Sequence, residues 1–311
     1  MEQGLDLSGR SVLVLGAGYV GGAFVRQALA RGLRVAALTR NPERAAALRA
    51  AGCGEVVEAD LAGVEWHGRL RRPFDFVVNC VSAGGRAVED YRHSYVAGMR
   101  SLGRWLADRP AGGTVVYTGS TGVYPQGNGE RVDEDAPLAG AGATAAVLRE
   151  AEEALAVGAR GAGARWFVLR LAGIYGPGRH GMLDRLRAGA AVLPGEPGHR
   201  MNLIHRDDVC GALWAALCAP AAVRDEIFNV CDGHPAPRAE VAAWLAARLG
   251  VPCPALGGSA SAAGPSPSGG RRRAPDRIVL AERIRSRLGW VPHFPDYRAG
   301  YEDILRRTAG G

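Results

Sequence analysis

Three glycines near the start of the chain have a spacing that suits the binding of a phosphate group. Gly16, Gly18 and Gly21 form a G-x-G-x-x-G pattern directly after the apolar run at residues 12–15. Glycine at these positions permits a tight turn, a close approach of the backbone to a pyrophosphate, and close packing of a helix on a strand. The amino terminus of the following helix offers N–H donors and a favourable dipole. The pattern therefore predicts a dinucleotide site formed by Gly16, Gly18, Tyr19, Val20 and Gly21.

The residues after the second apolar run bear on which nicotinamide cofactor binds. An acidic residue there would hydrogen-bond the ribose 2′-hydroxyl and repel a 2′-phosphate. The chain has Thr39, Arg40 and Asn41 at this point, with no acid, and arginine can hold a phosphate through two parallel hydrogen bonds. We expect NADP(H) to be preferred over NAD(H). The alternative interpretation is that Arg40 is an ordinary surface residue.

The basic residues restrict the chemistry further. All 38 basic side chains are arginine, and lysine is absent from the sequence. A Walker-type phosphate loop needs a lysine and is therefore excluded. Mechanisms that use a lysine Schiff base or a lysine nucleophile are excluded for the same reason.

Apolar runs alternate with helical patterns over the first two thirds of the chain, which is typical of parallel βαβ units. We expect strands at 11–15, 34–38, 55–59, 74–79, 114–118 and 166–171, and helices at 19–31, 42–51, 91–107 and 143–157. After residue 174 the alternation ends. There we expect helices at 207–218, 239–249, 278–288 and 297–307, with a short strand at 227–230.

These elements predict an α/β fold, namely a doubly wound parallel sheet (Rossmann) with a smaller C-terminal substrate lobe. Residues 1–174 would form the NAD(P)-binding domain, whose core also takes up parts of 200–230, and residues 175–311 would form most of the substrate lobe. Residues 257–270 contain only Gly, Ser, Ala and Pro, so we expect a flexible loop. Residues that follow the third and fourth strands are expected to contact the dinucleotide: Asp60, Leu61, Cys80, Val81 and Ser82.

Composition argues against several classes of partner. The formal net charge is +7, but the arginines are scattered and the densest run is 271–273, so we expect no nucleic-acid partner. No apolar run approaches the roughly 18 residues of a membrane span, and the first residues lack the features of a signal peptide. We therefore expect a cytoplasmic protein without membrane contact. The six cysteines include no C-x-x-C pair, so free thiols and no metal site are expected.

Five ordered segments carry a family resemblance. They are YTGSTGVY at 117–124, LRLAGIYGPGR at 169–179, NLIHRDD at 202–208, FNV at 228–230 and LGW at 288–290. Together they resemble the extended short-chain dehydrogenase/reductase superfamily, in its NAD(P)-dependent epimerase/dehydratase group, and most closely an atypical, YeeZ-like branch. The resemblance implies further cofactor contacts from Thr118, Gly119, Leu171, Ala172, Gly173 and Ile174. It also implies a possible homodimer through the helices at 91–107 and 143–157.

The resemblance fails at the residues that usually carry the chemistry. Typical members use a Ser or Thr after the fifth strand and a Tyr-x-x-x-Lys pair on the next helix, where the lysine lowers the pKa of the tyrosine. Ser120 matches the first position. Thr144 and Leu148 occupy the tyrosine and lysine positions, and Tyr95 stands where many members carry asparagine.

Other groups must then supply any proton that the reaction needs. Ser120, Tyr124 and His205 are the catalytic candidates, and the alternative for the last two is a purely structural role. The predicted substrate contacts are Ser82, Tyr95, Ser120, Tyr124, Tyr175, Arg179, Arg200 and Asn202. Arginine suits a carboxylate or phosphate, so Arg179, Arg200, Asn202 and His205 would either hold an anionic or polar substrate or pin the small lobe to the large one.

The favoured function is an NADP(H)-dependent oxidoreductase that reduces a carbonyl or imine of a small metabolite. A protonated imine would need little proton donation, which fits the missing Tyr–Lys pair. The first alternative is a non-catalytic NADP-binding regulatory or sensor protein. The second is an epimerase or dehydratase with a replacement acid/base.

Overall fold

The computed structural model describes residues 7–109, 113–257 and 276–309. The body of the molecule is a parallel sheet of seven strands in the order β12-β7-β5-β4-β1-β2-β3. Its strands are β1 (Ser11–Leu15), β2 (Arg34–Thr39), β3 (Glu55–Glu58), β4 (Phe76–Asn79), β5 (Thr114–Ser120), β7 (Arg165–Leu171) and β12 (Glu226–Val230). The order reverses between β1 and β4, which is the point where doubly wound folds bind ligands. The predicted α/β fold class is confirmed.

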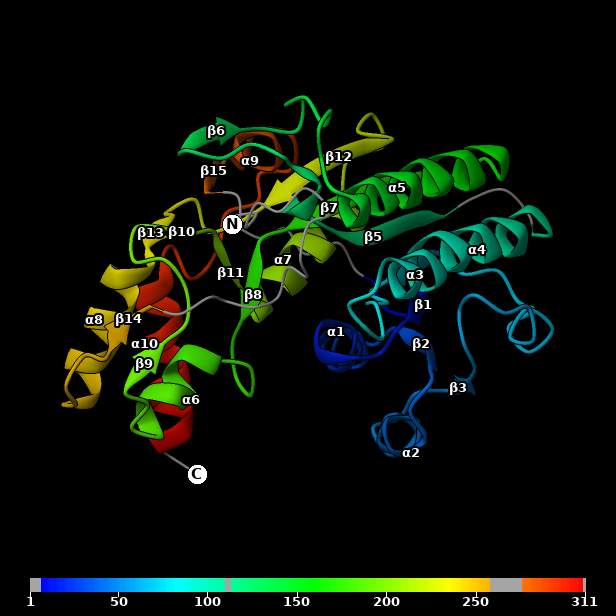
Figure 1. Ribbon diagram of the computed structural model, residues 1–311. Coiled ribbons are helices and arrows are strands. Elements are labelled where there is room, and N and C mark those ends of the chain that lie inside the picture. Colours follow the sequence, from blue (N-terminus) through cyan, green and yellow to red (C-terminus); the bar gives the residue numbers. More distant parts are fainter. Residues whose placement is uncertain (1–6, 110–112, 258–275, 310–311) are drawn as a thin grey trace.

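Helices cover both faces of this sheet (Figure 1). One face carries α1 (Tyr19–Ala30) and α7 (Arg206–Leu217), with α2 (Pro42–Ala50) beside β2 and β3. The other face carries α3 (Val88–Tyr91), a π-helical turn η1 (Arg92–Ala97), α4 (Gly98–Ala107) and α5 (Ala143–Gly161). Continuous apolar strands such as β1, with all five residues buried, are typical of a sheet covered on both faces.

The helices α4 and α5 approach each other closely within the chain. A Cβ atom on Gly158 would lie 2.8 Å from the Cα of Gly103, so the two backbones are nearly in contact there. The helix predicted at 91–107 begins earlier, at Val88, and its middle is the π-helical turn η1. Such turns are frequent at functional sites, and this one carries Tyr95.

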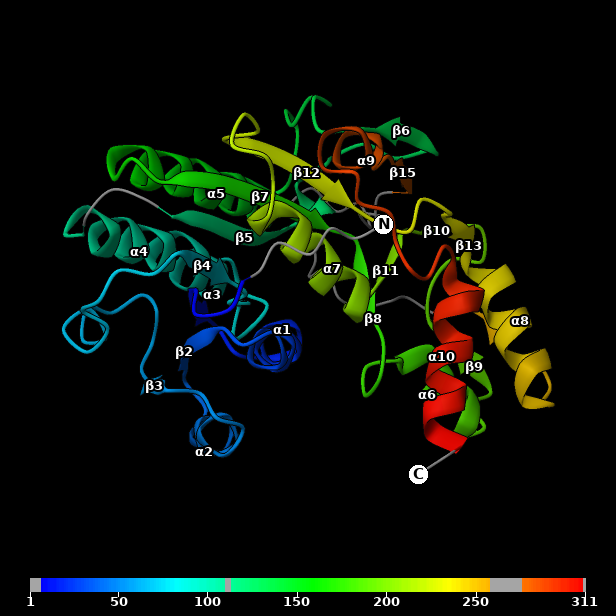
Figure 2. The same cartoon turned by 180° about the vertical axis from the view of Figure 1, so that it is seen from behind.

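A smaller lobe packs at one end of the sheet, with α6, α8 and α10 in its lower part (Figure 2). Its helices are α6 (Gly181–Arg187), α8 (Arg238–Leu249) and α10 (Tyr297–Ala309), whereas α9 (Glu282–Leu288) packs against the edge strand β12 of the sheet. Short strands pair around them: β8 (Gly173–Tyr175) with β11 (Leu203–His205), β9 (Val192–Leu193) with β14 (Ala255–Leu256), and β10 (Arg200–Met201) with β13 (Ala236–Pro237). Its own apolar core includes Leu183, Leu245 and Ile304.

One element predicted in the C-terminal part of the chain is wrong. The segment 278–288 is not a single helix, because Arg277–Val279 forms strand β15, which pairs in parallel with β6 (Glu130–Val132), and α9 begins only at Glu282. The β-branched Ile278 and Val279 suit a strand. Most of the predicted flexible loop at 257–270 lies outside the described residues.

None of the helices in the described part of the chain is long and apolar enough to cross a membrane.

Candidate active site

The glycine loop between β1 and α1 has the backbone geometry of a phosphate cradle. Gly16 has φ +79°, and a Cβ there would lie 2.6 Å from the backbone nitrogen of Val81. A Cβ on Gly21 would lie 2.3 Å from the Gly16 carbonyl oxygen. The first turn of α1 has no acidic residue and no side-chain cap, so its N–H groups are open to an anion. These residues fit the pyrophosphate of a dinucleotide.

Arg44 lies over this loop, although the sequence prediction did not include it. Asn41 caps α2 by accepting the Arg44 N–H at 2.7 Å. This cap and Pro42 fix the first turn of α2, and the Arg44 side chain extends towards Gly18. A Cβ on Gly18 would lie 3.1 Å from the Arg44 Nη1. A cap followed by proline marks the start of a helix. The sequence signal that could have found Arg44 was an arginine placed three residues after the capping asparagine.

The predicted ligand of the 2′-phosphate, Arg40, is partly neutralised. Its Nη1 lies 3.2 Å from Asp60 Oδ2, and His93 Nε2 lies 3.2 Å from the same oxygen. Burial works against the charge of Asp60, but hydrogen bonds from the Ala62 N–H and His93 lower the pKa of this carboxyl. Arg40 and His93 are exposed and Asp60 is partly exposed, so the pairing is easily exchanged for a ligand.

Ser120 ends β5 on a tightly held turn. Its Oγ accepts the Gly122 N–H at 3.0 Å and caps the 3-10 turn η2 (Thr121–Val123). Thr121 Oγ1 donates to the Leu171 carbonyl at 3.2 Å. Arg277, another residue that the prediction missed, donates to the carbonyls of Tyr124 at 2.7 Å and Thr121 at 2.8 Å. Ser120 itself stays partly exposed at the carboxyl edge of the sheet.

Tyr124 belongs to a buried polar chain instead of the surface of the cleft. Its hydroxyl donates to Asn229 Oδ1 at 2.7 Å and accepts from Arg170 Nη1 at 2.9 Å. Arg170 in turn donates to both oxygens of Glu152 at 3.0 and 2.8 Å, and the Asn229 N–H donates to Glu134 at 2.6 Å. Tyr124 is 1% exposed, and burial raises its pKa. These contacts favour the structural alternative for Tyr124.

His205 is also enclosed by the protein. It is 1% exposed, its ring centroid lies 4.1 Å from that of Phe294, and its Nδ1 accepts the Asp207 N–H at 3.3 Å. Burial lowers its pKa to about 4, so the imidazole is neutral near pH 7. A neutral, enclosed imidazole is poorly suited to donate a proton to a substrate.

The Tyr and Lys positions of the family hold side chains without comparable chemistry. Thr144 is partly exposed in the first turn of α5. Leu148 is 6% exposed, and its Cδ1 lies 3.7 Å from the place where a Cβ on Gly122 would be. A hydrocarbon therefore packs under the Ser120 turn where typical members place an ammonium group.

Two predicted substrate residues hold the chain together instead. Arg200 pairs with Asp276 through its N–H at 2.9 Å and Nη1 at 2.7 Å. The Asn202 side chain donates to the Arg277 carbonyl at 2.9 Å and accepts the Val279 N–H at 2.8 Å. It therefore pairs with the backbone of β15 as a neighbouring strand would. These contacts favour the alternative that Arg200 and Asn202 hold the small lobe to the rest of the protein.

The remaining predicted residues have mixed environments. Tyr175 is 4% exposed, and its hydroxyl lies 3.5 Å from the Asp296 carbonyl oxygen. Tyr95 is partly exposed, with its ring 5.4 Å from that of Tyr91. Arg179 is exposed, and its guanidinium carbon lies 5.5 Å from the centre of the Tyr19 ring.

The predicted cofactor residues after the other strands follow the same edge of the sheet as the glycine loop. Ser82 and Gly173 are exposed there, and Leu61, Leu171 and Ala172 are buried. Thr118 Oγ1 donates to the Asn79 carbonyl at 3.2 Å. Burial raises the pKa of the Cys80 thiol to about 12, so this cysteine is uncharged and unreactive.

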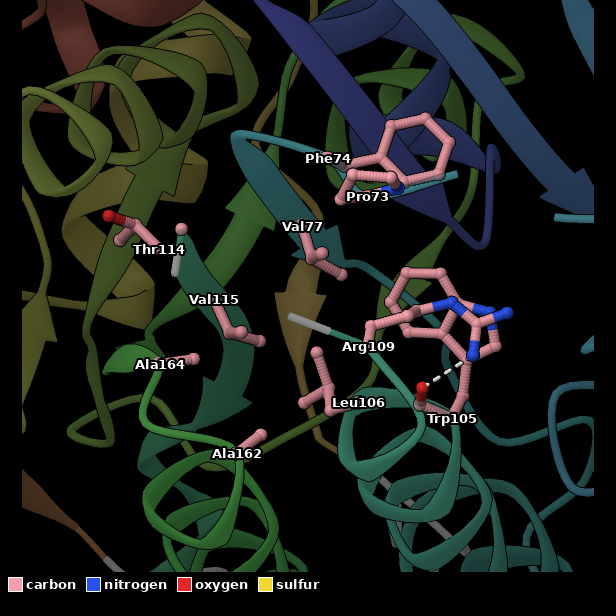
Figure 3. Close-up of a pocket in the computed structure, with 11 residues that line it drawn as sticks. Pro73, Phe74, Val77, Trp105, Leu106, Arg109, Thr114, Val115, Ala162 and Ala164 are labelled. Carbon is pink, nitrogen blue, oxygen red and sulfur yellow. Dashed lines mark hydrogen bonds between the residues drawn. The ribbon is translucent and has the colours of Figure 1, made fainter. Parts of the chain in front are cut away.

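A small cavity lies at the opposite, amino-terminal edge of the sheet. Figure 3 shows its lining, in which Trp105 and Leu106 of α4 face Val77, Val115 and Ala162. The cavity measures about 20 Å³, which is room for about one water molecule. It is far too small for a dinucleotide.

Comparisons with known proteins agree with this geometry. The model of the NAD dependent epimerase/dehydratase family matches residues 12–231. Protein YeeZ of Escherichia coli (strain K12) is 33% identical over 183 residues, which are 58% of this chain and 59% of YeeZ, so the match covers less than two thirds of that relative. A 3-diazoavenalumate denitrifying reductase of Streptomyces sp is 30% identical over 312 residues, which are 93% of this chain and 98% of that protein.

Solved structures give the same fold. DesIV, a dTDP-glucose 4,6-dehydratase from Streptomyces venezuelae with NAD and TYD bound, matches with a TM-score of 0.81 at 21% identity and covers 97% of both chains. At this identity the likeness shows the fold alone. The family model over residues 12–231 and the 30% identical reductase show that the chain belongs to the NAD-dependent epimerase/dehydratase family, an NAD(P)-binding family of oxidoreductases, epimerases and dehydratases.

Proposed function

We propose that this protein is an NADP(H)-dependent reductase whose substrate needs little or no proton donation from the enzyme. The observation that carries the proposal is the contrast around Ser120. The glycine cradle is complete, whereas the positions of the usual acid/base pair hold Thr144 and Leu148 and the nearby Tyr124 hydroxyl is used inside the protein. Hydride delivery is the chemistry that a bound nicotinamide would supply.

The residues of this chain would bind and orient the reactants. The glycine loop, the first turn of α1 and Arg44 would hold the pyrophosphate, and Arg40 would hold a 2′-phosphate. Ser120 would contact the substrate beside the nicotinamide, with its Oγ oriented by the Gly122 N–H. The buried Leu148 keeps water and charge away from the underside of this turn.

A suitable substrate carries its own electrophilic charge. A protonated imine or a diazonium group accepts a hydride without first receiving a proton from the protein. The Streptomyces relative is, by its name, a reductase that removes nitrogen from a diazo compound. This supports an activated nitrogen electrophile as the substrate class ahead of a simple sugar ketone.

Cofactor preference is tested by binding. We expect NADPH to bind more tightly than NADH, as measured by energy transfer from tryptophan to the reduced nicotinamide. A charge-assisted hydrogen bond is worth about 1.5–3 kcal/mol, so Arg40→Gln should weaken NADPH binding by about tenfold or more and leave NADH binding almost unchanged. Arg49→Gln, an exposed change on the neighbouring helix α2, is the control. An equal loss for both cofactors would contradict a 2′-phosphate contact.

Turnover is tested by following NADPH oxidation at 340 nm with iminium, arenediazonium, aldehyde and ketone compounds. We expect the charged electrophiles to react, and Ser120→Ala to keep the rate within about tenfold, since one acid/base group contributes about 10²–10⁴-fold. A loss of three orders of magnitude in this variant would show ordinary acid catalysis. Tight NADPH binding without any turnover would favour the sensor alternative.

A further inference from the structure

Tyr19 connects the glycine loop with a turn of the small lobe that lies 158 positions later in the chain. It is the first residue of α1, whose first turn has no side-chain cap and no acidic residue among the described residues. Its hydroxyl donates to the Pro177 carbonyl at 3.1 Å. The side chain is half-buried, and burial raises the pKa of the phenol. The hydroxyl therefore stays protonated near neutral pH and remains a donor.

The 176–179 turn, which follows β8, is closed on itself. The Gly176 N–H donates to the Arg179 carbonyl at 3.1 Å, and the Arg179 N–H donates to the Gly176 carbonyl at 2.9 Å. Arg206, the first residue of α7, extends towards the Pro177 carbonyl, with 3.5 Å between its Nη1 and the oxygen. Its guanidinium is itself held by the carboxylate of the next residue. The carbonyl that accepts the phenol is therefore fixed in place.

Gly176 gives the phenol the room it needs. It has φ +149°, a conformation that favours glycine, and a Cβ there would lie 2.8 Å from the Tyr19 Oη. Gly178 in the same turn also has a positive φ, of +75°, but a Cβ on it would meet nothing within 4 Å. The backbone conformation alone calls for glycine at Gly178, whereas contact with Tyr19 adds a second reason at Gly176.

The aromatic ring of Tyr19 is held as well as its hydroxyl. The guanidinium carbons of Arg179 and Arg206 lie 5.5 and 5.2 Å from the centre of this ring. Cations at such distances are attracted to the face of an aromatic ring. Tyr19 is therefore fixed from two sides of the small-lobe boundary, the 176–179 turn and the start of α7.

The position of Tyr19 bears on the phosphate cradle because the cradle is made of backbone N–H groups. Helix ends fray when nothing fixes them. In α2 the side chain of Asn41 caps the first turn, and α1 has no such cap. A loop that already has its binding conformation loses less entropy when the ligand arrives. The contact of Tyr19 with the small lobe does for α1 what a capping side chain does for other helices.

We propose that Tyr19 is a positioning residue of the dinucleotide site, through which the 176–179 turn keeps the phosphate cradle in its binding conformation. The proposal rests on the proposed function for the binding of a nicotinamide dinucleotide, and it is independent of the substrate and its reduction. It makes a turn of the small lobe part of the cofactor site, although that turn follows β8 and lies outside the glycine loop.

The alternative is that Tyr19 only docks the small lobe on the body of the protein. Loss of its hydroxyl would then lower the stability of the protein and leave its affinity for the cofactor unchanged. Affinity and thermal unfolding measured on the same preparation therefore separate the two roles.

The first test is Tyr19→Phe, with the Kd for NADPH and for NADH measured by energy transfer from tryptophan. We expect both cofactors to bind about two- to tenfold more weakly, since they share the pyrophosphate and a net hydrogen bond is worth this much. Tyr297→Phe is the control, because it removes a phenol hydrogen bond to Glu240 within the small lobe, and it should leave both Kd values unchanged. An unchanged Kd in Tyr19→Phe, or an equal loss in Tyr297→Phe, would overturn the proposal.

The two glycines of the turn give a second test. Gly176→Ala and Gly178→Ala both place a side chain at a positive φ, but only the first pushes on the Tyr19 hydroxyl. We expect Gly176→Ala to weaken cofactor binding by about fivefold or more relative to Gly178→Ala. In the Tyr19→Phe background this difference should shrink, because the atom nearest to the new Cβ is gone. Equal effects of the two alanines, or a difference that stays the same without the hydroxyl, would contradict the proposal.

Hydrogen exchange of the free protein needs no cofactor and covers the case in which Gly176→Ala does not fold. Tyr19→Phe should speed the exchange of the amides in the first turn of α1, since a segment with fewer contacts opens more easily. Unchanged exchange there would mean that the cradle is held without Tyr19 and would overturn the proposal. A protein that binds NADPH without oxidising it would contradict only the proposed function, whereas binding of neither cofactor would overturn both.

Discussion

Arg170 and Arg238 show two ways in which this protein treats a cation that folding takes partly or wholly out of water; Arg238, the first residue of α8, is partly buried, and its Nε has no hydrogen bond in the described residues. Arg170 lies in β7, is 2% exposed, and donates to both oxygens of Glu152 and to the Tyr124 hydroxyl. Burial works against its charge, but the hydrogen bonds and charge of Glu152 outweigh burial and raise its pKa. Arg238 has no comparable partner among the described residues. The difference separates a charge that organises the interior from one that no neighbouring carboxylate in the described residues neutralises.

The same contrast explains the position of Tyr124. Its hydroxyl sits in a chain that begins at Glu152 on α5 and ends at Glu134, so it connects the helix of the missing Tyr–Lys pair with β7, β12 and the turn after Ser120. A fully satisfied buried network rigidifies its surroundings. We infer that this chain keeps α5 and the Ser120 turn in place without the usual lysine.

The largest expected effect comes from breaking the paired region. Glu152→Gln would leave Arg170 buried without a counter-ion, and breaking such a pair costs about 3–5 kcal/mol of the free energy of unfolding. Urea unfolding at neutral pH measures this loss. Glu153→Gln, on the exposed side of the same helix next to Arg149, should cost less than about 1 kcal/mol. Similar losses in the two variants would remove the distinction drawn for Arg170.

A smaller loss is expected from Tyr124→Phe. The change leaves Arg170 Nη1 and Asn229 Oδ1 without a buried partner, which costs about 1–3 kcal/mol. Turnover and the Kd for NADPH should change little, because the hydroxyl acts inside the protein. Unfolding and NADPH oxidation of the same preparation separate the two roles. A collapse of kcat with unchanged stability would return Tyr124 to the catalytic candidates.

Asp232 is a buried carboxyl group that has no cationic partner within hydrogen-bond distance in the described residues. It is 2% exposed, its Oδ2 has no hydrogen-bond partner in the described residues, and burial raises its pKa from 3.8 to about 7. A raised carboxyl pKa means that its stabilising contribution is present below about pH 4 and is lost as the pH rises to about 7. Asp232→Asn should therefore stabilise the protein at about pH 8, on the order of 1 kcal/mol after the cost of burying the amide, and not at about pH 4.

A carboxylate with partners should behave in the opposite way. Burial works against the charge of Asp75, but hydrogen bonds from Ser11 and Arg10 lower its pKa. Its contribution is present above the unfolded pKa and is lost as the pH falls through the folded value, so Asp75→Asn should destabilise the protein at neutral pH. Urea unfolding across this pH range compares both variants. Equal pH profiles would contradict the assignment of Asp232 as unpaired.

The smallest effect is expected on the exposed face of α4 and α5. Glu150, which is partly exposed, pairs with Arg92 at 2.7 Å and with Arg100 at 2.9 Å, and both arginines are exposed. Exposed pairs are worth about 0–1 kcal/mol and weaken in salt. Glu150→Gln should therefore lower the free energy of unfolding by less than about 1 kcal/mol, and added salt should reduce even this. A larger, salt-independent loss would show that this face is buried in an assembly.

Much of the fold could be predicted because its signals are local. The glycine loop, the apolar strands and the capped start of α2 depend on residues within a few positions of one another. The segment 278–288 was predicted as one helix because strand β15 forms only by pairing with β6. In this pairing Arg277 lies opposite Glu130, about 147 positions earlier in the chain, so no local pattern reveals it. Arg44 was missed although its helix was predicted, because only the folded loop shows that it lies over Gly18.

The candidate site was harder to predict for the same reason. Tyr124 and His205 fall in the segments that carry the family resemblance, but their burial depends on Arg170, Asn229 and Phe294, which come from other elements. Arg200 and Asn202 meet their partners only at residues 276–279. Residue type alone cannot distinguish a hydrogen-bonding group aimed at a substrate from one that is satisfied within the protein.

The sequence by itself determined two things about this protein: a phosphate cradle after the first strand, and a site that works without lysine. Both follow from the types of residue present and their spacing, which folding cannot change. Only the tertiary structure decided which of the 38 arginines are neutralised. Arg170 and Arg238 have the same side chain, and the difference is whether a carboxylate from another element comes within about 3 Å, which is a property of the packed chain.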